Sequence, residues 1–142
     1  MSNWRRRTLG IGVVLSVSVG LVACSATSAT SVQESPNGRL IAVSGQTSDV
    51  QEQALAEGTV AWGRGDCMVV EAEETYLIVF PRGTTIGGSD EVILPDGYVI
   101  SAGDEVGLGG GFHPVSTASE LSATLGACLT EEVFWASGEV AE

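Results

Sequence analysis

One strand-like segment constrains the fold of this chain more than any other feature. The run Tyr76-Leu77-Ile78-Val79-Phe80 consists of aromatic, β-branched and aliphatic residues, and it is apolar at every position instead of at alternate ones. Since successive side chains of a strand point to opposite faces, such a strand must be covered on both sides. We therefore expect a mainly β fold: a small β-barrel, closed or partly open, with a helix packed against it.

Turn signals divide the rest of the sequence into short strands. In Pro95-Asp96-Gly97, proline presets its backbone angle, aspartate bonds to the local backbone and glycine accepts a positive φ, which predicts a tight turn. The polar stretch at 72–75 predicts a hairpin before Tyr76. The predicted strands are 40–44, 58–62, 67–71, 76–80, 91–94, 98–101, 105–108 and 133–137, and the segment 51–57 is ambiguous.

One short helix is predicted before the last strand. Thr117-Ala118-Ser119-Glu120 matches a capping box, in which the threonine and glutamate side chains satisfy backbone amides at the start of a helix. Leu121 and Leu125 would share one face of this helix, and Gly126 is suited to its end.

Residues 1–23 have the features of an export signal peptide. Arginines at 5–7 precede a mostly apolar stretch at 9–23, which is shorter than the about 20 residues that a membrane-spanning helix needs. The sequence Leu21-Val22-Ala23-Cys24 resembles the lipobox of bacterial lipoproteins. This resemblance implies cleavage before Cys24 and transfer of diacylglyceryl to its sulfur. The alternatives are an ordinary signal peptide and an uncleaved membrane helix, and either the general or the twin-arginine route would export the chain.

Lipidation of Cys24 would fix the location and the layout of the protein. Two acyl chains bind a bilayer stably, whereas one binds only marginally. The resemblance therefore implies a protein anchored to the extracytoplasmic face of the cell membrane. Residues 24–38, rich in serine, threonine and alanine, would form a flexible tether, and residues 39–142 a single small domain.

An acidic composition limits the partners of this domain. Cleavage removes three of the six arginines and leaves 18 acidic residues, so the mature chain has a formal net charge of −15. A body of this charge repels nucleic acid phosphates, which excludes nucleic-acid binding. The predicted partners are the membrane, through the lipid on Cys24, and a protein or a small ligand.

Two cysteines remain after Cys24 is assigned to the lipid. In an oxidising compartment Cys67 and Cys128 would form a disulfide, since two cysteines allow one intramolecular pairing. Closing a loop of 61 residues would contribute at most about 4 kcal/mol to stability. The alternatives are a reactive thiol and a zinc site, which lacks ligands because His113 is the single histidine. No metal and no cofactor are predicted.

A series of motifs extends the resemblance beyond the lipobox. The motifs are Asp66-Cys67-Met68-Val69-Val70, then Tyr76-Leu77-Ile78-Val79-Phe80-Pro81-Arg82-Gly83, then Leu94-Pro95-Asp96-Gly97 and Gly103-Asp104-x-Val106. Their order resembles that of small lipoproteins of high-GC Gram-positive bacteria, a resemblance that implies no particular activity. The layout is also similar to OB-like barrels, except that the helix comes before the last strand instead of in the middle.

The candidate functional residues lie near a glycine-rich segment. Residues 107–111 contain four glycines and precede Phe112-His113-Pro114. We expect a flexible loop here, because a phosphate-binding loop would need a different glycine spacing or a lysine. Adjacent carboxylates such as Glu73-Glu74 are expected to be solvated surface, and the large aromatic residues to pack in the core or at the barrel ends.

These observations predict a non-enzymatic binding or interaction module at the cell envelope. The anchor, the tether and the lack of a catalytic motif favour this function. One alternative is an envelope enzyme that uses His113 with nearby carboxylates, and another is a structural subunit of a membrane complex. The expected contact surface consists of Trp62, Gly109, Gly110, Gly111 and His113.

Overall fold

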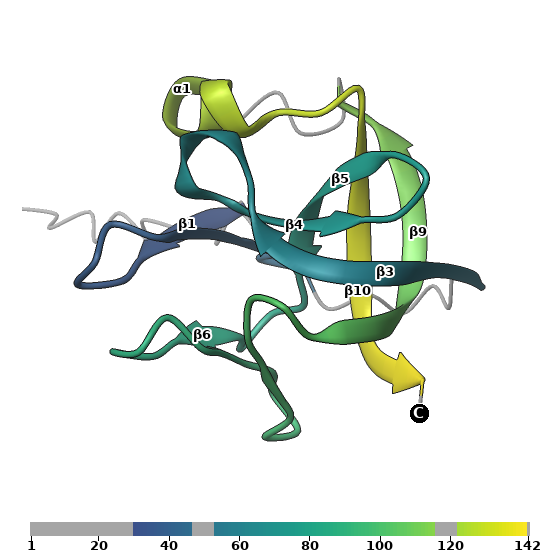
Figure 1. Ribbon diagram of the computed structural model, residues 1–142, viewed down its shortest axis with the longest axis horizontal. Helices are drawn as coiled ribbons and strands as arrows, with labels where there is room; N and C mark the ends of the chain where they lie inside the picture. The colour runs from purple at the N-terminus through teal and green to yellow at the C-terminus, as the bar shows by residue number, and fades with distance from the viewer. Residues whose placement is uncertain (1–29, 47–52, 116–121, 142) are drawn as a thin grey trace, which may run out of the picture.

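The computed structural model describes residues 30–46, 53–115 and 122–141, and ten strands make up most of this part of the chain (Figure 1). The strands are β1 (Ser31–Glu34), β2 (Leu40–Val43), β3 (Ala54–Trp62), β4 (Met68–Glu71), β5 (Thr75–Phe80), β6 (Thr85–Ile86), β7 (Val92–Ile93), β8 (Val99–Ile100), β9 (Glu105–Pro114) and β10 (Glu132–Ala141). The helical segments are the 3-10 helices η1 (Arg64–Asp66) and η3 (Gly126–Cys128) and the α-helix α1 (Ser122–Leu125).

Five of these strands close into a barrel. In the ring, β3 pairs with β4, β4 with β5, β5 with β10, β10 with β9, and β9 with β3. All of these pairings are antiparallel except β5–β10, in which Leu77 lies beside Val133. The predicted mainly β barrel is therefore confirmed, and the helical segments α1 and η3 precede the last strand as expected.

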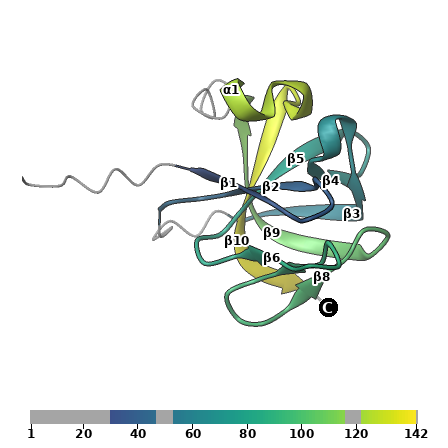
Figure 2. The same cartoon turned by 90° about the vertical axis from the view of Figure 1, so that its left-hand side faces the viewer.

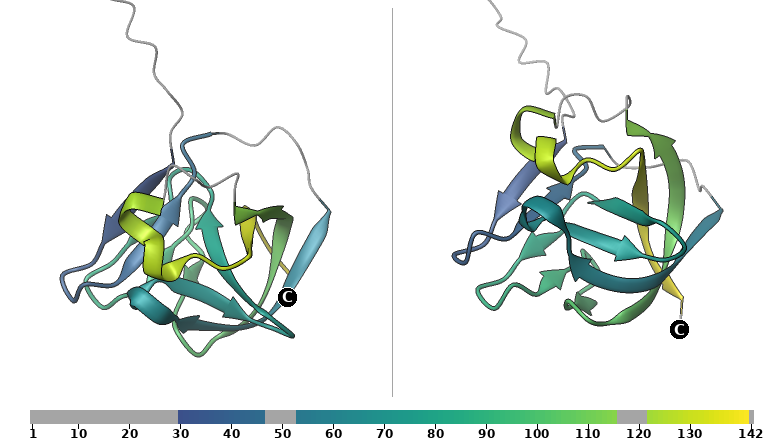
Figure 3. Two further views of the ribbon diagram at one scale, coloured as in Figure 1. Left: turned by 90° about the horizontal axis from the view of Figure 1, so that it is seen from above. Right: turned by 45° about the horizontal axis from the view of Figure 1, so that its top comes forward.

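Both faces of β5 are buried, as its sequence predicts. Ile78 and Phe80 belong to the main hydrophobic core, which fills the barrel. Leu77 and Val79 belong to a second core cluster, to which Leu125 of α1 and the disulfide cysteines contribute. The helical segment thus covers the outer side of this strand (Figure 3).

The glycine-rich segment is a strand, and the prediction of a flexible loop was wrong. It lies within β9, which pairs with β3 over residues 105–110 and with β10 over residues 107–114. A Cβ atom at Gly110 would lie 2.0 Å from the backbone oxygen of Trp135. Glycine is required at this point because β9 and β10 approach too closely for a side chain, next to a register shift between Ala136 and Val140.

The fold begins earlier than the predicted tether allows. β1 lies within the segment 24–38 that composition assigns to the tether, but it pairs antiparallel with β2, from Ser31 beside Val43 onward (Figure 2). The side-chain amide of Gln33 also donates a hydrogen bond to the backbone oxygen of Thr84 (2.8 Å). The composition is misleading here because strand pairing uses backbone groups and needs few apolar side chains. Residues 1–29, with the predicted signal peptide and Cys24, lie outside the described residues.

Two of the predicted turns are confirmed, one in the barrel and one in a small second sheet. β4 and β5 form the expected hairpin, with Glu71 beside Thr75. In the Pro-Asp-Gly turn, Gly97 has a φ of +91° and the Asp96 carboxylate accepts a hydrogen bond from the Tyr98 N–H (2.9 Å). This turn joins β7 to β8, which with β6 form a small sheet whose buried side chains close one end of the main core (Figure 2).

The helix differs from its prediction at its C-terminal end. α1 ends at Leu125, which is buried, but Gly126 begins η3 instead of terminating the helical segment. The predicted capping box at 117–120 lies outside the described residues.

Candidate functional site

A disulfide joins two loops on the outside of the barrel. Cys67, at the end of the β3–β4 loop, is bonded to Cys128 at the end of η3, and their Cα atoms are 5.8 Å apart. This confirms the predicted pairing. The loop must pass close to the sulfurs, since a Cβ at Gly65 would lie 2.9 Å from Cys128 Sγ and Gly65 has a φ of +76°. Glycine is the residue that accepts both conditions.

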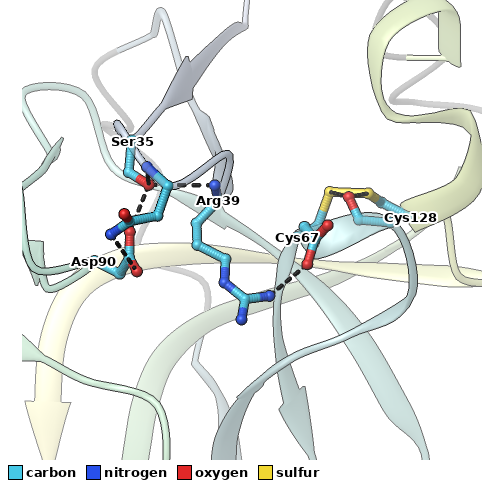
Figure 4. A network of polar contacts seen from close by, with 8 residues as sticks. Ser35, Arg39, Cys67, Asp90 and Cys128 are labelled. Atoms are coloured by element: carbon cyan, nitrogen blue, oxygen red, sulfur yellow. Dashed lines mark hydrogen bonds and ion pairs between the residues drawn. A yellow bond between two sulfur atoms is a disulfide. The ribbon is translucent and has the colours of Figure 1, made fainter.

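A chain of polar contacts extends from this disulfide across three turns (Figure 4). Arg39, in the β1–β2 turn, forms a salt bridge with Asp66, and its guanidinium lies 5.2 Å from the centre of the Trp62 ring. The backbone N–H of Arg39 donates to the hydroxyl of Ser35 (3.2 Å), which in turn donates to the Asp90 carboxylate (2.5 Å). The β1–β2 turn, the β3–β4 loop and the β6–β7 turn are therefore held together on one side of the barrel.

An open pocket of about 480 Å³ lies beside the disulfide. It is lined by residues 63–64 of the β3–β4 loop, residues 126–130 around η3, and Val69 and Thr75 from β4 and β5. Thr130 is fixed in its wall, because its hydroxyl accepts a hydrogen bond from the Leu77 N–H (3.0 Å). Arg64 is exposed at the edge and brings a positive charge to a pocket that is otherwise lined by small, apolar and hydroxyl-bearing residues.

The structure does not bring the predicted contact residues together. Trp62 ends β3, whereas His113 lies near the end of β9, and the antiparallel register pairs Thr59 with Glu105 at the start of β9. Trp62 packs partly against the main core and lies beneath Arg39. His113 is partly buried, with its ring centre 6.3 Å from that of Trp135 in an edge-to-face arrangement. The three predicted glycines, Gly109, Gly110 and Gly111, lie in the middle of β9.

A second feature, which the sequence analysis missed, is an aromatic patch formed by Tyr76 and Phe112. Their ring centres are 4.8 Å apart, and Phe112 also stands edge-on to the buried Phe134 at 4.9 Å. Partial burial raises the pKa of Tyr76 above its ordinary value of 10.0, and so do the nearby carboxylates of Glu74, Glu132 and Glu73. The one available signal was the acidic pair Glu73-Glu74, which Thr75 separates from Tyr76 and which was interpreted as solvated surface.

In residues 30–46, 53–115 and 122–141, no three side chains of His, Cys, Asp or Glu converge on a point where they could hold a metal ion. Within the same ranges, no helix combines the length and the apolar character needed to cross a bilayer.

Comparisons with known proteins do not assign this chain to a family. No family model matches it, and no curated protein and no solved structure gives a match. Its function has to be inferred from its own residues and geometry.

Proposed function

We propose that this protein is a lipid-anchored, extracytoplasmic binding domain without catalytic activity. Its contact surface would be the disulfide-linked side of the barrel, where the β3–β4 loop and η3 flank the pocket. The observation that carries this proposal is the Cys67–Cys128 disulfide, because it joins the two loops on either side of the pocket. Loops held in place before a ligand arrives lose less conformational entropy on binding, which favours recognition.

The disulfide also supports the proposed location. Disulfides persist in oxidising compartments and are rare in the bacterial cytosol. A disulfide whose Cα atoms are 5.8 Å apart within a folded core agrees with export of the chain. The resemblance of Leu21-Val22-Ala23-Cys24 to a lipobox supplies the means of export and the anchor.

The order of strands in the barrel supports the choice of surface. In OB-like barrels, which the sequence resembles, ligands bind over the second and third strands and the loops after the first and fourth. Counted along the ring in chain order, β3 to β5 are the first three barrel strands, and β9 and β10 are the fourth and fifth. The corresponding loops are those that carry Cys67 and Cys128, and the pocket also touches the second and third strands. The acidic charge argues for a protein or a small ligand instead of a nucleic acid.

Lipidation is tested by metabolic labelling with a fatty acid that carries a reporter group. We expect label on the wild-type chain and none on Cys24→Ala. The Cys24→Ala variant should also no longer be recovered in the membrane fraction. Cys67→Ala is the matched control, because it removes another thiol but should retain the label. Label on the Cys24→Ala variant, or the absence of label from the wild-type chain, would contradict the anchor.

The contact surface is tested by a photo-reactive amino acid at single positions of the full chain in its native envelope. We expect a specific crosslink from position 64, at the edge of the pocket. Position 139, which is exposed on β10 outside the pocket, serves as the control. Equal crosslinking from both positions would show that the disulfide-linked side is not the contact surface.

A further inference from the structure

The aromatic patch of Tyr76 and Phe112 lies outside the lining of the pocket and is only partly buried. Phe112 lies directly opposite the buried Phe134 in the register of β9 and β10 and stands edge-on to it, yet 37% of Phe112 remains exposed. Tyr76 is partly buried beside it and packs against the same core. The two rings thus lie edge-to-face near the end of β9 and the start of β5, with part of their surface open to solvent.

Carboxylates surround this patch and form an acidic rim, which we define as Glu73, Glu74 and Glu132. Glu73 and Glu74 come from the β4–β5 hairpin, and Glu132 is the first residue of β10. All three are exposed. Glu73 and Glu74 lie in the hairpin just before Tyr76, and Glu132 precedes Val133, which lies beside Leu77, so the strand register brings the three carboxylates close to Tyr76.

No arginine of the described residues forms a salt bridge with this rim. The one salt bridge among those residues joins Arg39 to Asp66. The whole sequence contains no lysine. The rim carboxylates are exposed and are therefore open to an arginine or lysine side chain of another molecule.

We propose that the aromatic patch and its acidic rim bind an arginine or lysine side chain from a basic segment of a partner protein. The face of an aromatic ring is negative and attracts a cation, and exposed carboxylates beside the ring add to that attraction. The strongly acidic body would also steer a basic segment toward this end of the barrel.

The geometry favours a protein segment over a small ammonium ion. A small quaternary ammonium ion is held by a cage in which several rings enclose it. Here only two rings are present, and they stand at 60° to each other on an open surface. The pocket does not enclose them, because its lining includes the neighbouring Thr75 but neither ring. The rim extends from a hairpin to another strand, which suits several positive charges carried along one chain.

This inference rests on the proposed function only in that the chain is a binding domain. It does not depend on lipidation or on the pocket. A failure of the fatty-acid labelling or of the crosslink from position 64 would therefore leave it standing.

The test is calorimetric titration of the folded protein with a blocked oligo-arginine peptide, with tetramethylammonium and an oligo-glutamate peptide as comparisons. We expect binding of oligo-arginine alone, and a paired Glu74→Gln/Glu132→Gln variant that binds about fivefold more weakly. Phe112→Leu, which keeps every charge, should bind about threefold more weakly, and Phe112→Tyr should restore binding.

Two controls separate this site from general attraction to an acidic protein. Glu57→Gln/Glu139→Gln removes the same charge from exposed positions outside the rim and should bind like the wild type. Circular dichroism of each variant shows that the fold is retained. Equal weakening by both charge pairs, or unchanged binding by Phe112→Leu, would overturn the proposal. Binding of tetramethylammonium as tight as that of the peptide would overturn the choice of a protein segment.

Discussion

Arg39 pairs with Asp66 although the two residues lie in different turns, and Asp66 directly precedes the disulfide residue Cys67. The same guanidinium lies over the ring of Trp62. One side chain thus links the N-terminal hairpin of β1 and β2 to the loop that borders the pocket. Since β1 and β2 lie outside the five-stranded ring, this contact is part of what holds them against it.

Replacing Arg39 with glutamine should lower the free energy of unfolding by about 1 kcal/mol. A partly exposed ion pair contributes about 0.2–1 kcal/mol and an exposed cation–π contact about 0.5–1 kcal/mol. Asp66→Asn should cost less, because it leaves the contact with Trp62 in place. Urea denaturation measures both, with Arg82→Gln as the control on an exposed arginine outside this network. A loss no larger than that of the control would contradict the assigned role.

Removing the disulfide should be the most destabilising change that leaves the packing of the barrel in place. The loop that it closes spans 61 residues, so Cys67→Ala/Cys128→Ala should lose up to about 4 kcal/mol in urea denaturation. A reductant should lower the stability of the wild type by a similar amount and leave the variant unchanged. If the reductant destabilised the variant equally, the effect would have another cause.

Gly110→Ala should destabilise the protein by about 3 kcal/mol or more. The added Cβ would lie 2.0 Å from the backbone oxygen of Trp135, and no flexible side chain can move to make room. Gly126→Ala is the matched control, since a Cβ there meets nothing within 4 Å, and it should change stability by about 0.5 kcal/mol or less. Thermal unfolding of the two variants compares them, and a fully stable Gly110→Ala would show that β9 and β10 lie farther apart than described.

The fold was predictable where a sequence pattern reports burial directly. The run from Tyr76 to Phe80 required cover on both faces, and it has a filled barrel on one side and the helical segment on the other. The turn at Gly97 followed from local backbone chemistry alone. The strand around Gly110 could not be predicted in this way, because glycine clusters usually mark loops. Glycine is needed there because the backbone of β10, which is distant in sequence, lies too close for a side chain.

The candidate site was less predictable than the fold for a related reason. The disulfide could be predicted from the number of cysteines, since Cys67 and Cys128 are the two that remain after Cys24 and can form one intramolecular pair. Tyr76 and Phe112 meet only because β5 and β9 flank the same strand, β10, in the ring. Trp62 and His113 were grouped by residue type, and the register of β3 with β9 separates them.

The acidic rim makes a prediction about the titration of Tyr76. Partial burial and the rim carboxylates disfavour the phenolate, so its folded pKa lies above the unfolded value of 10.0. Folding stability should therefore be unaffected by this residue below pH 10.0 and should fall as the pH rises through the folded pKa, because the unfolded chain loses the proton first.

Absorbance of the phenolate measures the pKa of Tyr76 in a Tyr98→Phe background. The chain has two tyrosines, so this substitution leaves Tyr76 as the single one. Glu74→Gln should lower this pKa toward 10.0, whereas Glu139→Gln, outside the rim, should not. An unchanged pKa in Glu74→Gln would place that carboxylate away from the aromatic patch and would weaken the case for the rim as a binding surface.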